Sequence, residues 1–332
     1  MGVFSLFSAH AGSPYARNVR KTRLTVLKRV AILAFLALIA VLIVNKAREM
    51  DWPEVLSALK AYEVGAVAVA FALGVPAYLA CAGFDLIGRH VTGHRLTVLR
   101  TSLISFTGYF FSLNLGALVG GLAFRYRLYM RYGLSGMNIG QIIGLSVVTN
   151  WSGYVVIAGA VMVYRPPELP PGWEVGPAAL RVTGILLLCL ASAYIALCAI
   201  KGGGSLKIRD LGFQIPSIGV AGMQFTLSAI SWGSIGAVIT WLLDGEVGWF
   251  TVMPVLMISA IAGIWSHIPS GLGVTEVVFL SLLGHLVPES RLLAAILVFR
   301  ITYYLVPFVL AAFAYFYLEA TTRRARTAAS PS

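Results

Sequence analysis

The feature that most constrains the fold is an apolar run over residues 249–285 that is interrupted at 266–276. One continuous helix over that run would rise about 55 Å, whereas the hydrocarbon core of a bilayer is about 30 Å thick. The helix is therefore expected to break where Pro269 removes a backbone donor and where Gly271 and Gly273 permit unusual dihedral angles. Irregular backbone at membrane depth is tolerated where protein buries it or where it lines an aqueous cavity. The interruption is thus a candidate site for a polar substrate inside a membrane.

Composition sets the class of protein. Of the 332 residues, 58% are hydrophobic and 11% are charged, which predicts an all-α polytopic membrane protein. A net charge of +12 would suggest nucleic-acid binding in a soluble protein. Here the basic residues flank apolar segments and act as topology signals, so no nucleic-acid partner is expected. The sequence shows no ATP-binding loop and no ligand cluster, so we expect no cofactor and no metal.

Segment lengths predict about six full transmembrane helices plus two interrupted or re-entrant helical hairpins. The full spans are expected at 30–45, 64–86, 139–163, 177–199, 217–243 and 292–318, and the interrupted segments at 98–124 and 249–286. A short interfacial amphipathic helix is expected at 52–62, with Pro53 in its first turn. The predicted domains are a basic N-terminal arm at 1–29, a single transmembrane domain at 30–319 and a basic tail at 320–332.

Lysine and arginine set the expected orientation. Basic residues precede the first span, which places both termini in the cytoplasm of a multi-pass cell (inner) membrane protein. If segment 98–124 enters and leaves on one side, most of the 25 basic residues become cytoplasmic. A single tilted span of about 27 residues would instead move Arg125, Arg127 and Arg131 outside. The charge bias therefore favours a hairpin.

This topology contains an internal symmetry. Residues 30–163 and residues 177–318 each predict two spans, an interrupted segment and a further span, starting from opposite sides of the membrane. Such inverted repeats with broken helices are typical of secondary transporters, whose sites lie where the two breaks approach each other. The two halves show no repeat at the level of individual residues.

A cluster of arginine and tyrosine follows the first interrupted segment. In a helix over 125–132, Arg127 and Arg131 would share a face, as would Tyr126 and Tyr129. The planar fork of arginine suits a phosphate group, and tyrosine suits the membrane interface. The alternative is a cytoplasmic topology anchor with interfacial aromatic residues.

Two groups of motifs resemble one known family. The glycine pair 120–121 with residues 125–129 and 133–135, and the later runs 268–276 and 300–307, are similar to the transmembrane domain of the lysylphosphatidylglycerol synthase family. That domain is also called the multiple peptide resistance factor flippase domain. The matches cover nearly the whole chain in the expected order.

The resemblance implies a polytopic protein associated with moving aminoacylated or other phospholipids between leaflets, so membrane phospholipid is the expected partner. The family also includes stand-alone members of uncertain role. Ser270 stands where the family commonly has glycine, which makes the loop less permissive. The chain ends at Ser332, soon after the last predicted span and without an aminoacyl-transfer domain, so we expect no synthase activity and no catalytic residues.

Glu276 is the sharpest single candidate, because an ionisable residue within a span normally has a partner or a task. Arg300 is its expected ion-pair partner. The alternatives are a cap of the following half-helix, or direct contact with a lipid headgroup or a proton. Asn114 is either the counterpart, in the first interrupted segment, of the later helix break, or a residue that hydrogen-bonds a freed carbonyl. Asp85 is expected to pair with Arg89, four residues later.

Three classes of function remain open. The favoured hypothesis is a lipid translocase with Arg125, Arg127, Tyr129, Glu276 and Arg300 at the substrate and with helix breaks at Asn114, Gly120, Gly121, Pro269, Ser270, Gly271 and Gly273. The second is a non-transporting partner of a separate lipid synthase or glycosyltransferase. The third is an intramembrane lipid-modifying enzyme, which would require Ser270 to act with His267 or His285.

Overall fold

The computed structural model describes residue 48 and residues 51–116, 121–167, 176–208, 211–266 and 268–328. The predicted N-terminal arm, the span at 30–45, His267 and Gly120 lie outside these ranges. In chain order the described helices are α2 (Trp52–Lys60), α3 (Val64–Thr92), α4 (Val98–Leu115), α5 (Phe124–Arg131), α6 (Gly136–Tyr164), α7 (Pro177–Lys201), α8 (Ile218–Leu242), α9 (Trp249–Ser266), α10 (Val274–Leu283), α11 (Glu289–Phe299) and α12 (Val306–Ala328). A short antiparallel hairpin of β1 (Ser205–Ile208) and β2 (Leu211–Gln214) connects α7 to α8, with Ser205 opposite Gln214.

Six of these helical segments are long and apolar enough to cross a membrane, which confirms the polytopic helical fold class. They are Val64–Thr92, Gly136–Tyr164, Pro177–Lys201, Ile218–Leu242, Trp249–Ser266 and Glu289–Thr321. Five coincide with predicted full spans, and the sixth is α9, the first arm of the second interrupted segment. The last helix continues to Ala328, past the predicted tail boundary at 320. Phe313 and Phe316 are exposed on its surface, as expected of side chains that face lipid.

Local sequence explains where the helices begin. Pro53 lies in the first turn of α2 as predicted, and the Asp51 side chain accepts the backbone N–H of Glu54. Thr97 caps α4 and Ser135 caps α6 in the same way. Each cap satisfies one of the N–H groups that a helix start leaves without an intrahelical acceptor.

The first interrupted segment is a hairpin, because α5 runs back along α4. Three facing pairs follow one another along the two arms: Ser112 with Gly121, Gly108 with Arg125, and Arg100 with Tyr132. Helix α4 ends at Leu115 and is followed by Gly116, whose φ of 90° is open to glycine and unfavourable for other residues. The structure therefore confirms the hairpin over the single tilted span. Gly121 lies in a π-helical turn at the start of the returning arm, and its role as a break residue stays a prediction.

The second interrupted segment is also a hairpin. Helix α10 packs back against α9 after a 3₁₀ turn, η2 (Pro269–Gly271). Gly271 and Gly273 have φ values of 58° and 79°, and Ser270 has a φ of 60°. The left-handed region costs a residue with a side chain about 1–2 kcal/mol. The break therefore lies where the sequence predicts it, and Ser270 adopts a conformation that glycine would adopt without strain.

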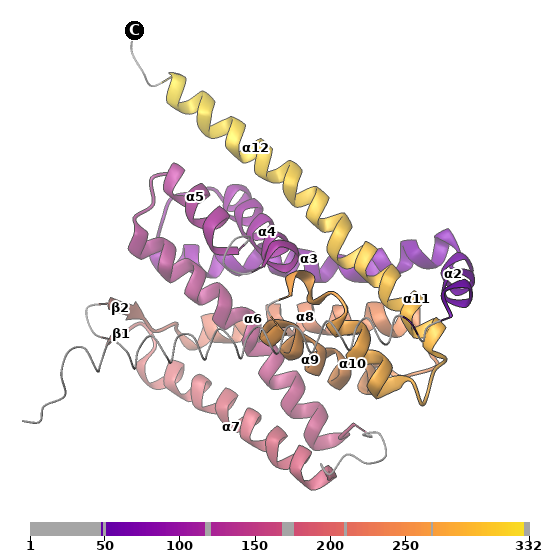
Figure 1. Ribbon diagram of the computed structural model, residues 1–332. Helices are drawn as coiled ribbons and strands as arrows, with labels where there is room; N and C mark the ends of the chain where they lie inside the picture. The colour runs from indigo at the N-terminus through magenta and orange to yellow at the C-terminus, as the bar shows by residue number, and fades with distance from the viewer. Residues whose placement is uncertain are drawn as a thin grey trace, which may run out of the picture. The chain divides into compact units, whose positions relative to one another are not determined.

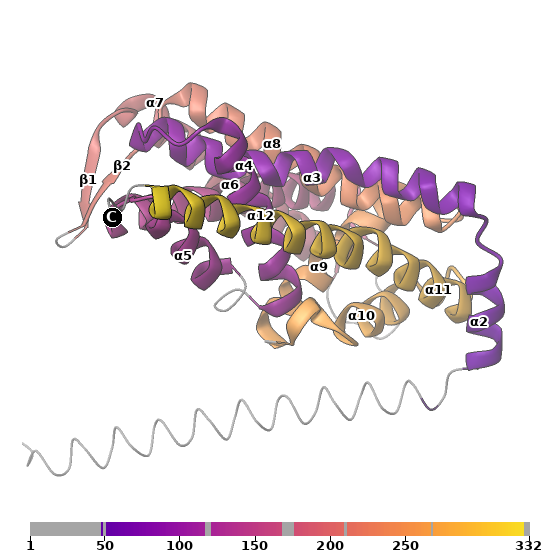
Figure 2. The same ribbon diagram turned by 90° about the horizontal axis from the view of Figure 1, so that it is seen from above.

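The two hairpins enter from opposite ends of the helical bundle. Helix α2 and the start of α11 lie together at one end, joined by a hydrogen bond from Ser290 to Glu54, while α5, the β-hairpin and the end of α12 lie at the other (Figure 1, Figure 2). Helix α3 packs on α8, α4 packs on α12, and α9 packs on α6. In the two predicted halves, α4 corresponds to α9 and α6 corresponds to α12. Exchanging the halves therefore converts the contact of α4 with α12 into the contact of α9 with α6. The packing thus supports the inverted repeat, while the predicted domain boundaries remain predictions.

Candidate functional site

The tips of the two hairpins meet in the interior of the bundle. The hydroxyl of Ser270 donates to the carbonyl of Asn114 over 3.5 Å, and α4 packs directly on η2. The amide of Asn114 donates to the carbonyls of Phe110, at 2.8 Å, and Tyr304, at 3.3 Å. Asn114 therefore lies at the first break and also bonds a carbonyl freed by a second helix, so both interpretations of this residue hold.

Arg300 and Glu276 form the predicted ion pair beside these tips. Nε of Arg300 donates to one carboxylate oxygen of Glu276, and Nη2 donates to the other over 2.9 Å. The same guanidinium donates to the backbone carbonyls of Ser270, at 2.9 Å, and Gly271, at 3.1 Å. The exposed fractions of the two side chains are 9% and 15%. Arg300 thus fixes the broken backbone to the last span. The carboxylate of Glu276 pairs with Arg300, and no described side chain forms a capping hydrogen bond at the start of α10.

A π-helical turn, η3 (Arg300–Leu305), presents Arg300 to the break. Pro307 explains the turn, because it has no N–H to donate to the carbonyl four residues earlier. The carbonyls that a π-turn releases need other donors, and such turns are frequent at functional sites. The hydroxyl of Tyr78 on α3 donates to the carbonyl of Thr302, and Asn114 donates to that of Tyr304. Pro307 is the sequence signal from which this turn could have been predicted.

Replacing Tyr78 with phenylalanine tests the support of the π-turn. The substitution leaves the buried carbonyl of Thr302 without the tyrosine donor, so we expect a loss of about 1–3 kcal/mol in the free energy of unfolding. The measurement is unfolding of the purified protein in mixed detergent micelles. Tyr164→Phe is the matched control, because that ring is exposed. Equal stability of the two variants would contradict the assigned role of Tyr78.

A second buried cluster lies between α3, α5 and α6. Asp85 is fully buried and pairs with Arg125. Its other oxygen accepts the Tyr129 hydroxyl at 2.8 Å, and Arg125 also donates to Ser146 at 2.8 Å. The predicted pairing of Asp85 with Arg89 is wrong: Nε of Arg89 donates to the carbonyl of Leu96 instead. The hairpin brings Arg125 against the buried face of α3, a contact that helical spacing alone does not reveal.

Gly108 provides the room for that cluster. A Cβ atom at this position would collide with Cγ and Cδ of Arg125. The absence of a side chain lets α5 approach α4 closely enough for the guanidinium to reach Asp85. Arg125 and Tyr129, both predicted as substrate residues, are therefore buried and bonded to Asp85, and their contacts join the first hairpin to α3.

The remaining arginines of α5 contact the end of α12. Arg127 pairs with Glu319 over 3.0 Å, and Arg131 pairs with the same carboxylate oxygen. Their shared face is confirmed. Tyr126 and Tyr129 differ, because Tyr126 is 44% exposed whereas Tyr129 is buried. The end of the first hairpin is thus fastened to the last helix by charge.

The chemistry available at the hairpin tips is charge pairing. Across the described ranges, no group of three or more His, Cys, Asp or Glu side chains is arranged to hold a metal ion. Ser270 and His285 lie beyond opposite ends of α10, a helix of about 15 Å. They cannot form a reacting pair in this arrangement. A guanidinium, a carboxylate and freed backbone carbonyls instead suit recognition of a charged headgroup.

The fold and this site define a polytopic α-helical membrane protein in which two opposed hairpins meet at an ion pair. Residues 28–311 match the lysylphosphatidylglycerol synthase TM region family, and the chain belongs to that family. The resemblance of the two groups of motifs is thereby confirmed.

Relatives extend over most of the chain. It is 38% identical over 300 residues to the inner membrane protein YbhN of Escherichia coli, a match that covers 90% of this chain and 94% of that protein. It is 29% identical over 272 residues to the protein slr0712 of Synechocystis, covering 79% and 82% of the two chains. A further match, 36% identical over 95 residues, is to a phosphatidylglycerol lysyltransferase of Staphylococcus haemolyticus and covers 11% of that protein.

Proposed function

We propose that the protein moves a phospholipid headgroup between leaflets, past the contact between the two hairpin tips. The observation that carries the proposal is the Arg300–Glu276 pair, held at the meeting point of two helix breaks that enter from opposite ends. Buried charges within a membrane are costly and usually mark a pathway. Broken helices that meet at the membrane midplane are the sites of many secondary transporters.

The ion pair provides a mechanism of partner exchange. A phosphate group would take the place of the Glu276 carboxylate on the Arg300 fork, because two of its oxygens can accept the paired N–H donors of the guanidinium as the two carboxylate oxygens do. A cationic amine on the same headgroup would then neutralise Glu276. Neither protein charge is left unpaired during the exchange, which avoids the penalty of an isolated charge in a low-dielectric interior.

This argument favours a headgroup that carries both a phosphate and an amine. The name of the staphylococcal relative points to phosphatidylglycerol and its lysyl ester as the lipid class. An aminoacylated phosphatidylglycerol supplies both charges, whereas phosphatidylglycerol alone would leave Glu276 unpaired. In the proposed orientation both termini are cytoplasmic, so the first hairpin opens to the cytoplasm and the second to the opposite side.

Leaflet accessibility of labelled lipids tests the proposal. The purified protein is reconstituted into vesicles that contain a trace of fluorescent lysylphosphatidylglycerol or fluorescent phosphatidylglycerol, and chemical quenching from outside reports the labelled outer fraction. We expect faster exchange of the amine-bearing lipid than in empty vesicles, with phosphatidylglycerol slower. Rates equal to those of empty vesicles for both lipids would overturn the proposal.

A further inference from the structure

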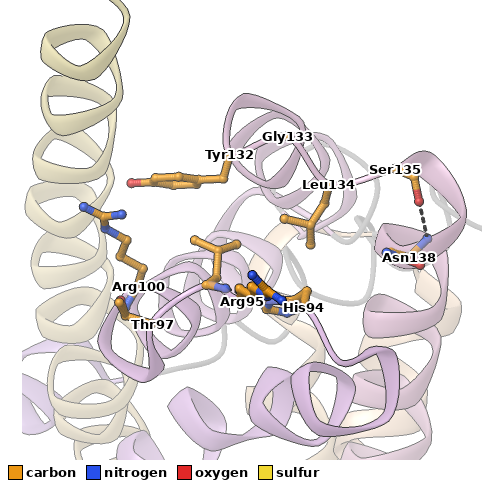
Figure 3. Close-up of a pocket in the computed structure, with 10 residues that line it drawn as sticks. His94, Arg95, Thr97, Arg100, Tyr132, Gly133, Leu134, Ser135 and Asn138 are labelled. Atoms are coloured by element: carbon orange, nitrogen blue, oxygen red, sulfur yellow. Dashed lines mark hydrogen bonds between the residues drawn. The ribbon is translucent and has the colours of Figure 1, made fainter. Parts of the chain in front are cut away.

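A polar pocket opens at the mouth of the first hairpin, apart from the tips. Its volume is about 550 Å³, and its walls come from the α3–α4 connection and from the α5–α6 connection (Figure 3). His94, Arg95, Thr97, Arg100, Tyr132 and Ser135 are among the residues that line it. The guanidinium of Arg100 lies 5.4 Å from the centre of the Tyr132 ring, across this mouth. The pocket is thus bounded by the entry and the exit of the hairpin.

Positive charge is concentrated on this pocket. Two arginine side chains line it, and none of the described residues that line it is acidic. Helices α4 and α6 both begin at its wall, after the capping residues Thr97 and Ser135. The N–H groups of a first helical turn carry a partial positive charge and bind anions. The arginines and the two helix starts therefore favour the same ligand charge.

The ring of His94 forms part of the pocket wall. Nδ1 of His94 accepts the backbone N–H of Leu96 at 3.3 Å, so the proton of the neutral ring is assigned to Nε2. Nε2 is buried, and no described residue accepts from it. Burial, followed by the nearby charge of Arg89, lowers the pKa of His94 and keeps the ring neutral at pH 7. Nε2 therefore faces the protein, and the pocket is bounded at this point by a neutral ring.

We propose that this pocket binds the phosphate group of an anionic ligand, either free phosphate or the phosphodiester of a lipid headgroup. Arg95 and Arg100 supply charge, and the starts of α4 and α6 supply backbone donors. The site is distinct from the Arg300–Glu276 pair, so it does not depend on translocation. Its position at the hairpin mouth makes it a binding site at the membrane surface.

Binding to the full-length protein in detergent tests this site with two probes. Inorganic phosphate is titrated by calorimetry, and retained lipid is counted by native mass spectrometry after exposure to phosphatidylglycerol or phosphatidylcholine. Arg95→Gln and Arg100→Gln are each expected to weaken phosphate binding roughly tenfold, the size of a lost charge-assisted hydrogen bond. Arg181→Gln, at an exposed position on α7, removes the same charge elsewhere and is expected to change neither readout.

The two probes separate the two sources of phosphate. Loss of phosphatidylglycerol retention in both site variants, with phosphatidylcholine unchanged, identifies a lipid headgroup. Loss of inorganic phosphate binding with unchanged lipid retention identifies a free phosphate ligand. If both site variants bind inorganic phosphate and retain lipid as well as the Arg181→Gln control does, the proposal is overturned. If Arg100→Gln does not fold, Arg95→Gln alone decides the outcome, because the Arg95 side chain is exposed.

Discussion

Replacing Arg300 with glutamine is expected to lower the free energy of unfolding by about 3–5 kcal/mol, because it leaves the largely buried carboxylate of Glu276, which is 15% exposed, without its counter-ion. The shortened side chain also leaves the carbonyls of Ser270 and Gly271 without their donor. The second hairpin should therefore lose its fixed tip, and lipid exchange in reconstituted vesicles should fall to the rate of empty vesicles. Stability is measured by unfolding in mixed detergent micelles, and exchange by the quenching assay.

Arg291→Gln is the matched control for that variant. Arg291 also pairs with carboxylates, Asp244 and Glu246, but at the exposed end of the bundle. Its loss is expected to cost at most about 1 kcal/mol, the range of surface ion pairs. Glu276→Gln combined with Arg300→Gln removes both charges and should recover most of the lost stability without restoring exchange. Equal stability of Arg300→Gln and Arg291→Gln would contradict the assignment of a buried pair.

Replacing Asp85 with asparagine is expected to have a comparable effect on stability, about 3–5 kcal/mol, because Arg125 would remain buried without a counter-charge. The Tyr129 hydroxyl would at the same time lose a charged acceptor. Since this cluster joins the first hairpin to α3, the change should loosen that hairpin. Protease cleavage at α5 and unfolding in mixed micelles measure the two consequences.

Asp244→Asn provides the comparison, because the Asp244 side chain is 80% exposed and its pairing with Arg291 is a surface contact. The double variant Asp85→Asn with Arg125→Gln should be more stable than Asp85→Asn alone, since it removes the unpaired charge. A stability loss for Asp85→Asn no greater than for Asp244→Asn would show that Arg125 finds another partner or reaches water.

The positions of the breaks could be predicted from the sequence. An apolar run too long for a bilayer must fold back, and proline with nearby glycines indicates where. Glu276 and Arg300 could also be paired in advance, because two opposite charges in adjoining apolar segments each need a counter-ion. The charge bias of the loops was enough to favour a hairpin over a tilted span at 98–124.

The partner of Asp85 could not be predicted in the same way. Arg89 lies one helical turn away and is the obvious local partner, yet Arg125 reaches Asp85 because Gly108 admits it to the buried face of α3. The proposed phosphate pocket could not be predicted either, because it also forms between segments that are distant in the sequence. His94 and Arg100 are separated in sequence from Tyr132 and Ser135, and the return of α5 along α4 brings the two connections together.

By itself, the sequence determined that this chain crosses a membrane, that two of its segments are broken, and that a glutamate and an arginine within it need each other. These follow from hydrophobicity, segment length and the cost of an unpaired charge, which are properties of the chain alone. The tertiary structure alone decided that the tips meet through Ser270 and Asn114 and that Asp85 holds Arg125, because specific contacts between distant segments depend on how the helices pack.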